Sequence, residues 1–233
     1  MVGRARRSTP HLDSPPPRDP LRPRPKDLQA ARRSATKRIK VVTYASWERV
    51  VASLGVRLGP PDASLLDLAS QLDLVPPSDW PAMVVAARIR EQIDPILTGR
   101  PIRDPSEAQL DFLTRLAREA GETVATPSSL EVASAWIDVF LGRRTALALQ
   151  SLKLQRDDVC DRRRVHDSPD LERKVLVQRV QVSSLRDDGL VYFRGGNGKC
   201  GWPSSLQVVA RAGTPDAQVA LEEQSGFWIE DDG

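Results

Sequence analysis

Residues 174–193 read KVLVQRVQVSSLRDDGLVYF, and their pattern indicates the fold class of the C-terminal region. Over 174–182, valines alternate with other residues, with one change of parity. β-branched residues at that period predict a strand. Asp188-Gly189 supplies the positive φ angles of a tight turn, and residues 190–193 predict the returning strand. The stretch therefore predicts an antiparallel hairpin.

Further short strands are expected on both sides of this hairpin. We expect an opening strand at 157–159, a second turn at 195–198, a strand over 199–202, one helical turn at 203–206 and a last strand at 207–210. This order of strands and turns resembles an SH3-like or Tudor-like small barrel over about residues 154–211. The resemblance rests on topology and turn chemistry, and it implies a docking module without naming its ligand.

The preceding part of the chain has helical periodicity. The expected helices are one over 44–54 that Gly55 ends, one capped by Asp62, one from 78–79 that Pro95 stops or kinks, one from a capping box at 104–107 to Gly121, and one from 128–131 past Gly142. The sequence therefore predicts an α+β protein, with a helical N-terminal domain followed by a small SH3-like β-barrel.

Residues 106–141 carry a second resemblance. The matching positions are Gln109, Leu110, Leu113, Leu116, Ala117 and Gly121, then Glu131, Ala133, Ile137 and Asp138. The pattern is similar to a small two-helix module of bacterial proteins of unassigned role. Val132 interrupts the Glu-Ala-Ser signature of that module. The resemblance implies no catalysis.

Charge is distributed unevenly along the chain. Residues 1–40 hold seven prolines and twelve basic against three acidic residues, a net charge of +9, although the whole chain carries only +3. Such a segment buries too little apolar surface to order itself, so we expect a disordered basic tail over 1–40. It is interpreted either as a phosphate-binding tail or as a solubilising one, or as the product of a start codon assigned too far upstream. We expect a helical domain over 41–152, the barrel over 153–212 and an acidic tail over 213–233.

Composition narrows the class of protein. No run approaches the roughly 18 apolar residues of a membrane span, and no apolar segment follows the basic N-terminus as in a signal peptide. Cys160 and Cys200 lack CxxC spacing and are expected to be ordinary thiols. We expect a cytoplasmic protein with no membrane partner and no cofactor. The abundance of Arg over Lys points to a GC-rich bacterial source.

Basic and aromatic residues alternate in the predicted barrel. The candidate nucleic-acid-binding residues are Arg162, Arg163, Arg164, Arg194, Lys199, Tyr192 and Trp202. Guanidinium and ammonium groups bind backbone phosphates, and aromatic rings stack on bases. A small barrel also needs aromatic residues for its core, so that structural interpretation stays open.

Catalytic patterns are weak. Asp170, Glu172 and Lys174 contain the residue types of a Mg²⁺-dependent nuclease site and would share one face of a strand, but solvated strand ends also look like this. His166 is the one histidine outside the tail, too few for a histidine-based zinc site, and a Cys160–His166 dyad is disfavoured.

Our leading hypothesis is a non-enzymatic DNA-binding or DNA-associated accessory protein, with nucleic acid as its partner and DNA favoured. The first alternative is a protein–protein adaptor whose barrel binds a peptide and whose residues 227–232 form a free acidic-aromatic docking motif. The second alternative is the Mg²⁺-dependent nuclease. The sequence predicts no oligomeric state.

Overall fold

A computed structural model describes residues 25–37, 43–44, 46–166, 174–195, 200–223 and 227–230. Its helices are α1 Pro25–Lys37, α2 Trp47–Leu58, α3 Ala63–Ser70, α4 Ala82–Thr98, α5 Glu107–Ala120, α6 Leu130–Leu152 and α7 Pro215–Glu223, with one 3₁₀ turn, η1, at Pro203–Ser205. Its strands are β1 Thr43–Tyr44, β2 Val159–His166, β3 Lys174–Arg186, β4 Val191–Phe193, β5 Cys200–Gly201, β6 Leu206–Ala210 and β7 Phe227–Glu230.

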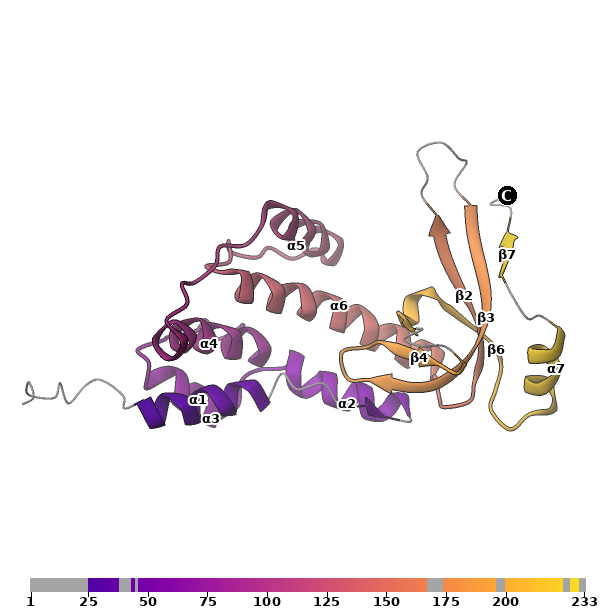
Figure 1. Cartoon of the computed structure of the whole chain (residues 1–233), viewed down its shortest axis with the longest axis horizontal. Helices are drawn as coiled ribbons and strands as arrows, with labels where there is room; N and C mark the ends of the chain where they lie inside the picture. The colour runs from indigo at the N-terminus through magenta and orange to yellow at the C-terminus, as the bar shows by residue number, and fades with distance from the viewer. Residues whose placement is uncertain are drawn as a thin grey trace, which may run out of the picture.

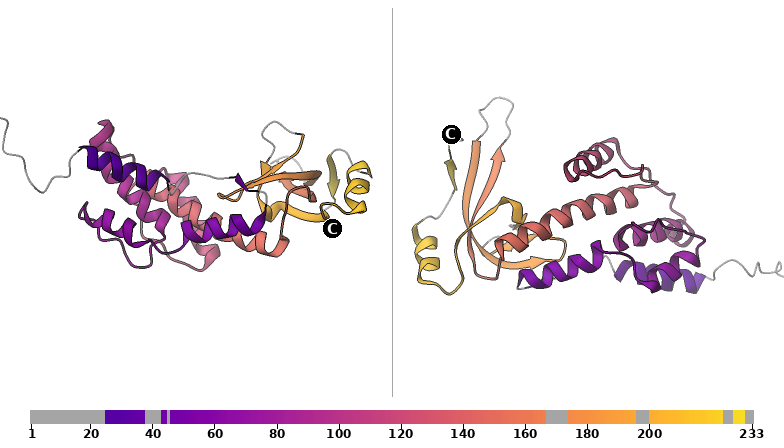
Figure 2. Two further views of the ribbon diagram at one scale, coloured as in Figure 1. Left: turned by 90° about the horizontal axis from the view of Figure 1, so that it is seen from below. Right: turned by 180° about the vertical axis from the view of Figure 1, so that it is seen from behind.

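Helices dominate one end of the molecule and an antiparallel sheet the other, so the predicted α+β class is confirmed (Figure 1). α6 runs from the helical end to the sheet, as two further views also show (Figure 2). None of the helices described is long and apolar enough to cross a membrane.

The long strand β3 organises the sheet. β2 pairs with it along one edge, from Val159↔Gln181 to His166↔Lys174. On the other edge its C-terminal half pairs with β4 and its N-terminal half with β7. The order is β5-β4-β3-β2-β6, with β1 and β7 as additional partners of β3. The hairpin predicted between β3 and β4 is confirmed, with Gly189 at a φ of +95°.

The sheet and two helices share one core. Val50 and Leu54 of α2 and Leu149 of α6 pack against the inner face of the sheet, where Val182 and Val191 are fully buried. A separate core lies between α4, α5 and α6 and includes Trp136, whose ring meets Trp80 edge-on at 6.2 Å. Burial of apolar surface therefore holds the predicted helical and strand regions together, across the expected boundary at 152/153.

The structure corrects the predicted tail at residues 25–37, which form helix α1. Leu28, Ala31 and Ala35 are buried against α4, and Arg32 donates from Nε to Oδ1 of Asp94 at 2.6 Å. Packing on α4 supplies the apolar contacts that the segment lacks by itself, and this stabilises the helix. Residues 1–24 of the predicted tail lie outside the described part of the chain.

The C-terminal segment also differs from the expected one. Residues 215–223 form α7, whose Ala217 and Ala220 pack on Val159. Residues 227–230 pair with β3 from Phe227↔Gln178 to Glu230↔Val175, so the backbone of the proposed docking motif lies in the sheet and is not free. An unpaired edge of β3 provides hydrogen-bonding groups for this strand.

Several helix boundaries shift from those expected. α2 continues through Gly55 to Leu58, and Gly59 caps it. The extra turn places the side chain of Leu58 against Gly142 of α6. Ser106, not Asp104, caps α5, and Ser106 and Gln109 satisfy each other's backbone N–H groups. Pro95 lies inside α4, which extends to Thr98.

Candidate nucleic-acid interface

The three consecutive arginines of β2 point to opposite faces of the sheet because strand side chains alternate. Arg162 and Arg164 share a face with Cys160, which is fully buried in the core between the sheet and the helices. Arg163 lies on the other face and is exposed. The predicted basic cluster is therefore divided, and only Arg162 and Arg164 extend the inner face of the sheet.

Arg162 is a buried cation without an acidic partner among the described residues. It is 8% exposed, and its Nε has no hydrogen-bond partner in the described part of the chain. Its guanidinium carbon lies 5.5 Å from the ring centroid of Phe193, a cation–π contact. Burial, and then the charge of Arg164, lower the pKa of Arg162. Both effects disfavour a positive charge here, so an anion bound beside it would be stabilised.

Gly201 leaves the space that this guanidinium occupies. A Cβ at Gly201 would lie 3.0 Å from Nε of Arg162 and 3.3 Å from Cζ of Phe193. Gly201 lies on β5 opposite Val191, and its own φ is not in the left-handed region. Close approach, and not backbone freedom, is therefore what requires a small residue at this position.

No known protein family, curated protein or solved structure matches this chain.

Most other arginines of this region are neutralised by carboxylates. Arg179 pairs with Asp161 at 2.5 Å, and Arg211 pairs with Asp158 at 3.0 Å. Arg194, a predicted site residue, pairs with Asp157 at 2.5 Å. This contrast distinguishes Arg162, because an arginine already paired with a carboxylate has less to gain from binding a phosphate.

The two predicted aromatic site residues, Tyr192 and Trp202, differ in their contacts and exposure. The hydroxyl of Tyr192 accepts a hydrogen bond from Nη1 of Arg186 at 2.7 Å, so this residue takes part in a local contact. Trp202 is 38% exposed at the start of η1 and keeps ring surface available to solvent. Phe193, which was not among the predicted site residues, is the ring that contacts Arg162. In the sequence, the alternation of Phe193 with Tyr192 was the available signal. In the structure, its pairing with Val182 places it on the inner face.

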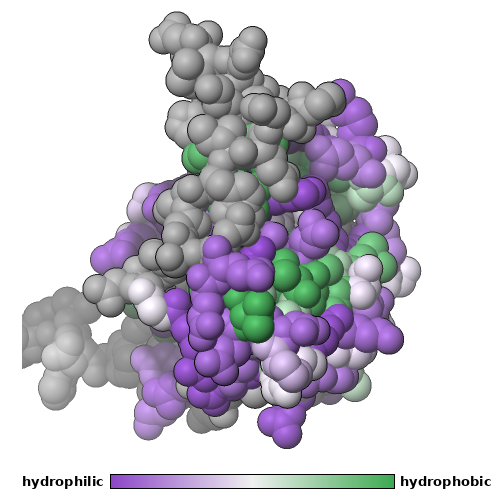
Figure 3. Space-filling view, turned by 90° about the vertical axis from the view of Figure 1, so that its right-hand side faces the viewer, coloured by the Kyte–Doolittle hydropathy of each residue, from purple (hydrophilic) through white to green (hydrophobic). Residues whose placement is uncertain are grey.

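The face at the α7 end of the molecule has a different character. Figure 3 shows a hydrophobic area there, surrounded by hydrophilic residues. The large apolar side chains exposed on β6 and α7 are Val209 and Val219. Arg162, which has no acidic partner in the described part of the chain, lies instead on the inner face of the sheet.

Several predicted site residues cannot be placed. Lys199, Asp170 and Glu172 lie outside the described residues, and Lys174 is the first residue of β3. The nuclease hypothesis therefore stays a prediction. Among the residues that the structure describes, no group of three or more His, Cys, Asp or Glu side chains is arranged to hold a metal ion.

The two cysteines differ in burial, and we predict that they differ in reactivity. Cys160 is fully buried, and burial raises the pKa of its thiol to about 12, with a further contribution from Asp158. The thiolate is the reactive form, so Cys160 should resist iodoacetamide at pH 8 in the folded protein. Cys200 is half-buried and should be modified first.

Mass spectrometry of peptides after timed alkylation would test this difference. We expect Cys200 to be labelled in the native chain, and Cys160 to be labelled at a comparable rate only in denaturant. A Cys200→Ser variant should therefore remain unlabelled while folded. Rapid native labelling of Cys160 would contradict the burial described here and would revive the disfavoured Cys160–His166 dyad.

Proposed function

We propose that this protein is a non-enzymatic DNA-binding or DNA-associated accessory factor that contacts backbone phosphates through the arginines of β2. The observation that carries the proposal is the buried guanidinium of Arg162, which has no carboxylate partner among the described residues. Because Nε of Arg162 is itself buried, a phosphate would supply the missing negative charge at the terminal Nη groups of the guanidinium. Arg164, two residues along β2, would contact the same backbone.

The rest of the interface follows from the shape of the sheet. β2 and β3 extend beyond the helices as an antiparallel pair (Figure 1). Exposed Arg163 would add charge on the opposite face of this pair, and Trp202 offers a ring on which a base can stack. Phosphate contacts of this kind position a protein on nucleic acid without reading sequence.

The small-barrel resemblance and the basic N-terminus fit the same proposal. Short antiparallel strands and the turn η1 before β6 are features that a small SH3-like barrel would have. Residues 1–24 hold six arginines against two aspartates, which would add electrostatic affinity that is independent of sequence. Under this proposal the protein acts in the cytoplasm and needs no cofactor.

An Arg162→Met variant would test the proposal directly. Methionine keeps the length and apolar surface of the arginine stem but removes the charge. We expect affinity for double-stranded DNA to fall about tenfold, as for the loss of one charge-assisted contact. The slope of log K against log salt should fall by about one unit. The free energy of unfolding should stay the same or rise by about 1 kcal/mol, because an uncompensated buried charge is removed.

The measurement is fluorescence anisotropy with labelled double- and single-stranded DNA at several salt concentrations, with and without Mg²⁺. Arg194→Ala is the matched control, because that arginine is already paired with Asp157 and should affect binding little. Equal losses in both variants would show that binding depends on general charge and not on the Arg162 site. No binding by the unmodified chain at low salt would reject the proposal, and Mg²⁺-dependent cleavage would support the nuclease alternative.

A further inference from the structure

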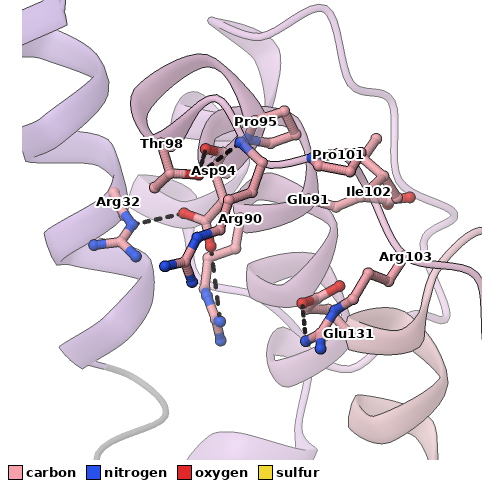
Figure 4. A pocket seen from close by; sticks show the side chains of 11 residues that line it. Arg32, Arg90, Glu91, Asp94, Pro95, Thr98, Pro101, Ile102, Arg103 and Glu131 are labelled. Carbon is pink, nitrogen blue, oxygen red and sulfur yellow. Dashed lines mark hydrogen bonds and ion pairs between the residues drawn. The ribbon is translucent and has the colours of Figure 1, made fainter.

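A cationic cavity lies at the helical end of the molecule, between α1, α4, the loop after α4 and the first turn of α6. Its volume is about 340 Å³, at the low end of the range of roughly 300–1,000 Å³ for ligand pockets. Arg32, Arg90, Arg100 and Arg103 line it, together with Glu91, Asp94 and Glu131 (Figure 4). We propose that this cavity binds a small organic phosphate, independently of the proposed DNA interface.

The charge around the cavity favours an anion. Glu91 is 4% exposed and is already compensated by an ion pair with Arg88, which does not line the cavity. Ser128 also donates a hydrogen bond to Oε2 of Glu91 at 3.0 Å. Four arginines therefore face two carboxylates, Asp94 and Glu131, that are not neutralised from outside the cavity. A phosphate dianion would balance the excess positive charge.

Three of the arginines that line the cavity lie beside carboxylates, and two of them keep N–H donors that are not used in hydrogen bonds. Figure 4 shows Arg32 and Arg90 directed toward Asp94 from two sides. The Arg32 contact is a hydrogen bond of 2.6 Å, whereas Nη2 of Arg90 lies 3.9 Å from Oδ2 of Asp94. Nη2 of Arg103 lies 3.7 Å from Oε1 of Glu131. Both longer distances exceed hydrogen-bonding range, so these two guanidinium groups retain N–H donors for a ligand.

The remaining wall indicates an organic part of the ligand. Pro95, Pro101 and Ile102 line the same cavity, and Ile102 is 46% exposed. Arg100 is exposed and has no acidic partner among the described residues. The guanidinium of Arg100 therefore lies beside an apolar surface, and this combination suits a phosphate ester with a small apolar group.

Isothermal titration calorimetry of the full chain with phenyl phosphate, at an ionic strength held constant with NaCl, would test the site. Arg100→Ala and Arg103→Ala should each weaken binding at least tenfold and leave the melting temperature unchanged, since both side chains are exposed. Arg49→Ala, an exposed arginine on α2 outside the cavity, should bind as the unmodified chain does.

The Arg162→Met variant separates this site from the sheet. Retained phenyl phosphate binding by that variant supports the cavity, whether or not DNA binding is lost. Loss of binding in Arg162→Met but not in Arg100→Ala or Arg103→Ala would assign the ligand to the sheet and overturn the inference. Absence of saturable binding by the unmodified chain would overturn it as well, without bearing on the DNA proposal.

Discussion

Replacing Gly189 by alanine should destabilise the protein by about 3 kcal/mol or more, because two unfavourable effects combine. Gly189 has a φ of +95°, a conformation that side chains with a Cβ adopt only with strain. A Cβ there would also lie 2.3 Å from Cγ2 and 2.8 Å from Oγ1 of Thr145. Thr145 is 4% exposed on α6, and its β-branched side chain has few rotamers in a helix. The overlap can therefore be relieved only by moving the hairpin away from α6.

Chemical denaturation measures this effect, and two variants separate its parts. Gly195→Ala is the matched control, since Gly195 has a φ of +71° with no atom within 4 Å of the added Cβ. It should cost about 1 kcal/mol, from the backbone alone. In the Gly189→Ala background, Thr145→Ala should restore part of the stability, although alone it should destabilise. Equal costs at Gly189 and Gly195 would show that the close contact with α6 is unimportant.

Replacing Asp187 by alanine should cost about 3 kcal/mol, at the lower end of the range of roughly 3–5 kcal/mol for breaking a buried ion pair. The Asp187 side chain is 2% exposed, and its Oδ1 lies 3.4 Å from Nη1 of Arg57, which is itself 10% exposed. Oδ2 accepts a hydrogen bond from Ser53 Oγ at 3.2 Å. Without the carboxylate, the charge of Arg57 remains buried, although Nη1 can still donate to the backbone oxygen of residue 187 at 3.0 Å.

The adjacent Asp188 is the control for this second variant. Its side chain is 24% exposed, pairs with Arg186 at 2.7 Å and accepts a hydrogen bond from the backbone N–H of Leu190 at 3.1 Å. Asp188→Ala should therefore cost about 1 kcal/mol, clearly less than Asp187→Ala. Replacing Arg57 by methionine in the Asp187→Ala background should recover stability, because it removes the unpaired charge. Thermal or denaturant unfolding would report both results. A double variant less stable than Asp187→Ala would contradict this account.

Both sites lie where the β3–β4 turn meets the helices, through α2 for Asp187 and α6 for Gly189. The turn itself was predictable, because Asp-Gly between two apolar runs specifies a tight hairpin. Its role as an anchor between sheet and helices was not predictable. The residues that contact the turn are more than forty positions away in the chain, and no local pattern identifies them.

The candidate interface was only partly predictable. The arginine-rich strand was evident, but sequence could not show that Arg163 and Arg164 would point to opposite faces until the strand was placed. Nor could it show that Arg194 pairs with Asp157, while Arg162 contacts the ring of Phe193 and has no acidic partner among the described residues. Whether an arginine is neutralised depends on which carboxylate the fold brings within about 4 Å, and sequence separation does not determine that distance.

Local sequence patterns were enough to predict the α+β class, the β3–β4 hairpin and the helices α3, α5 and α6 to within a few residues, because each depends on local periodicity, capping or turn chemistry. Long-range packing was needed to show that residues 25–37 form a helix, that residues 227–230 join the sheet and that Arg162 is buried with no acidic partner among the described residues. Those features depend on surfaces supplied by distant elements: α4 for the first, the edge of β3 for the second, and Phe193 with Gly201 for the third. Burial and ion pairing depend on which residues lie close together in the folded chain, and local sequence does not specify those residues.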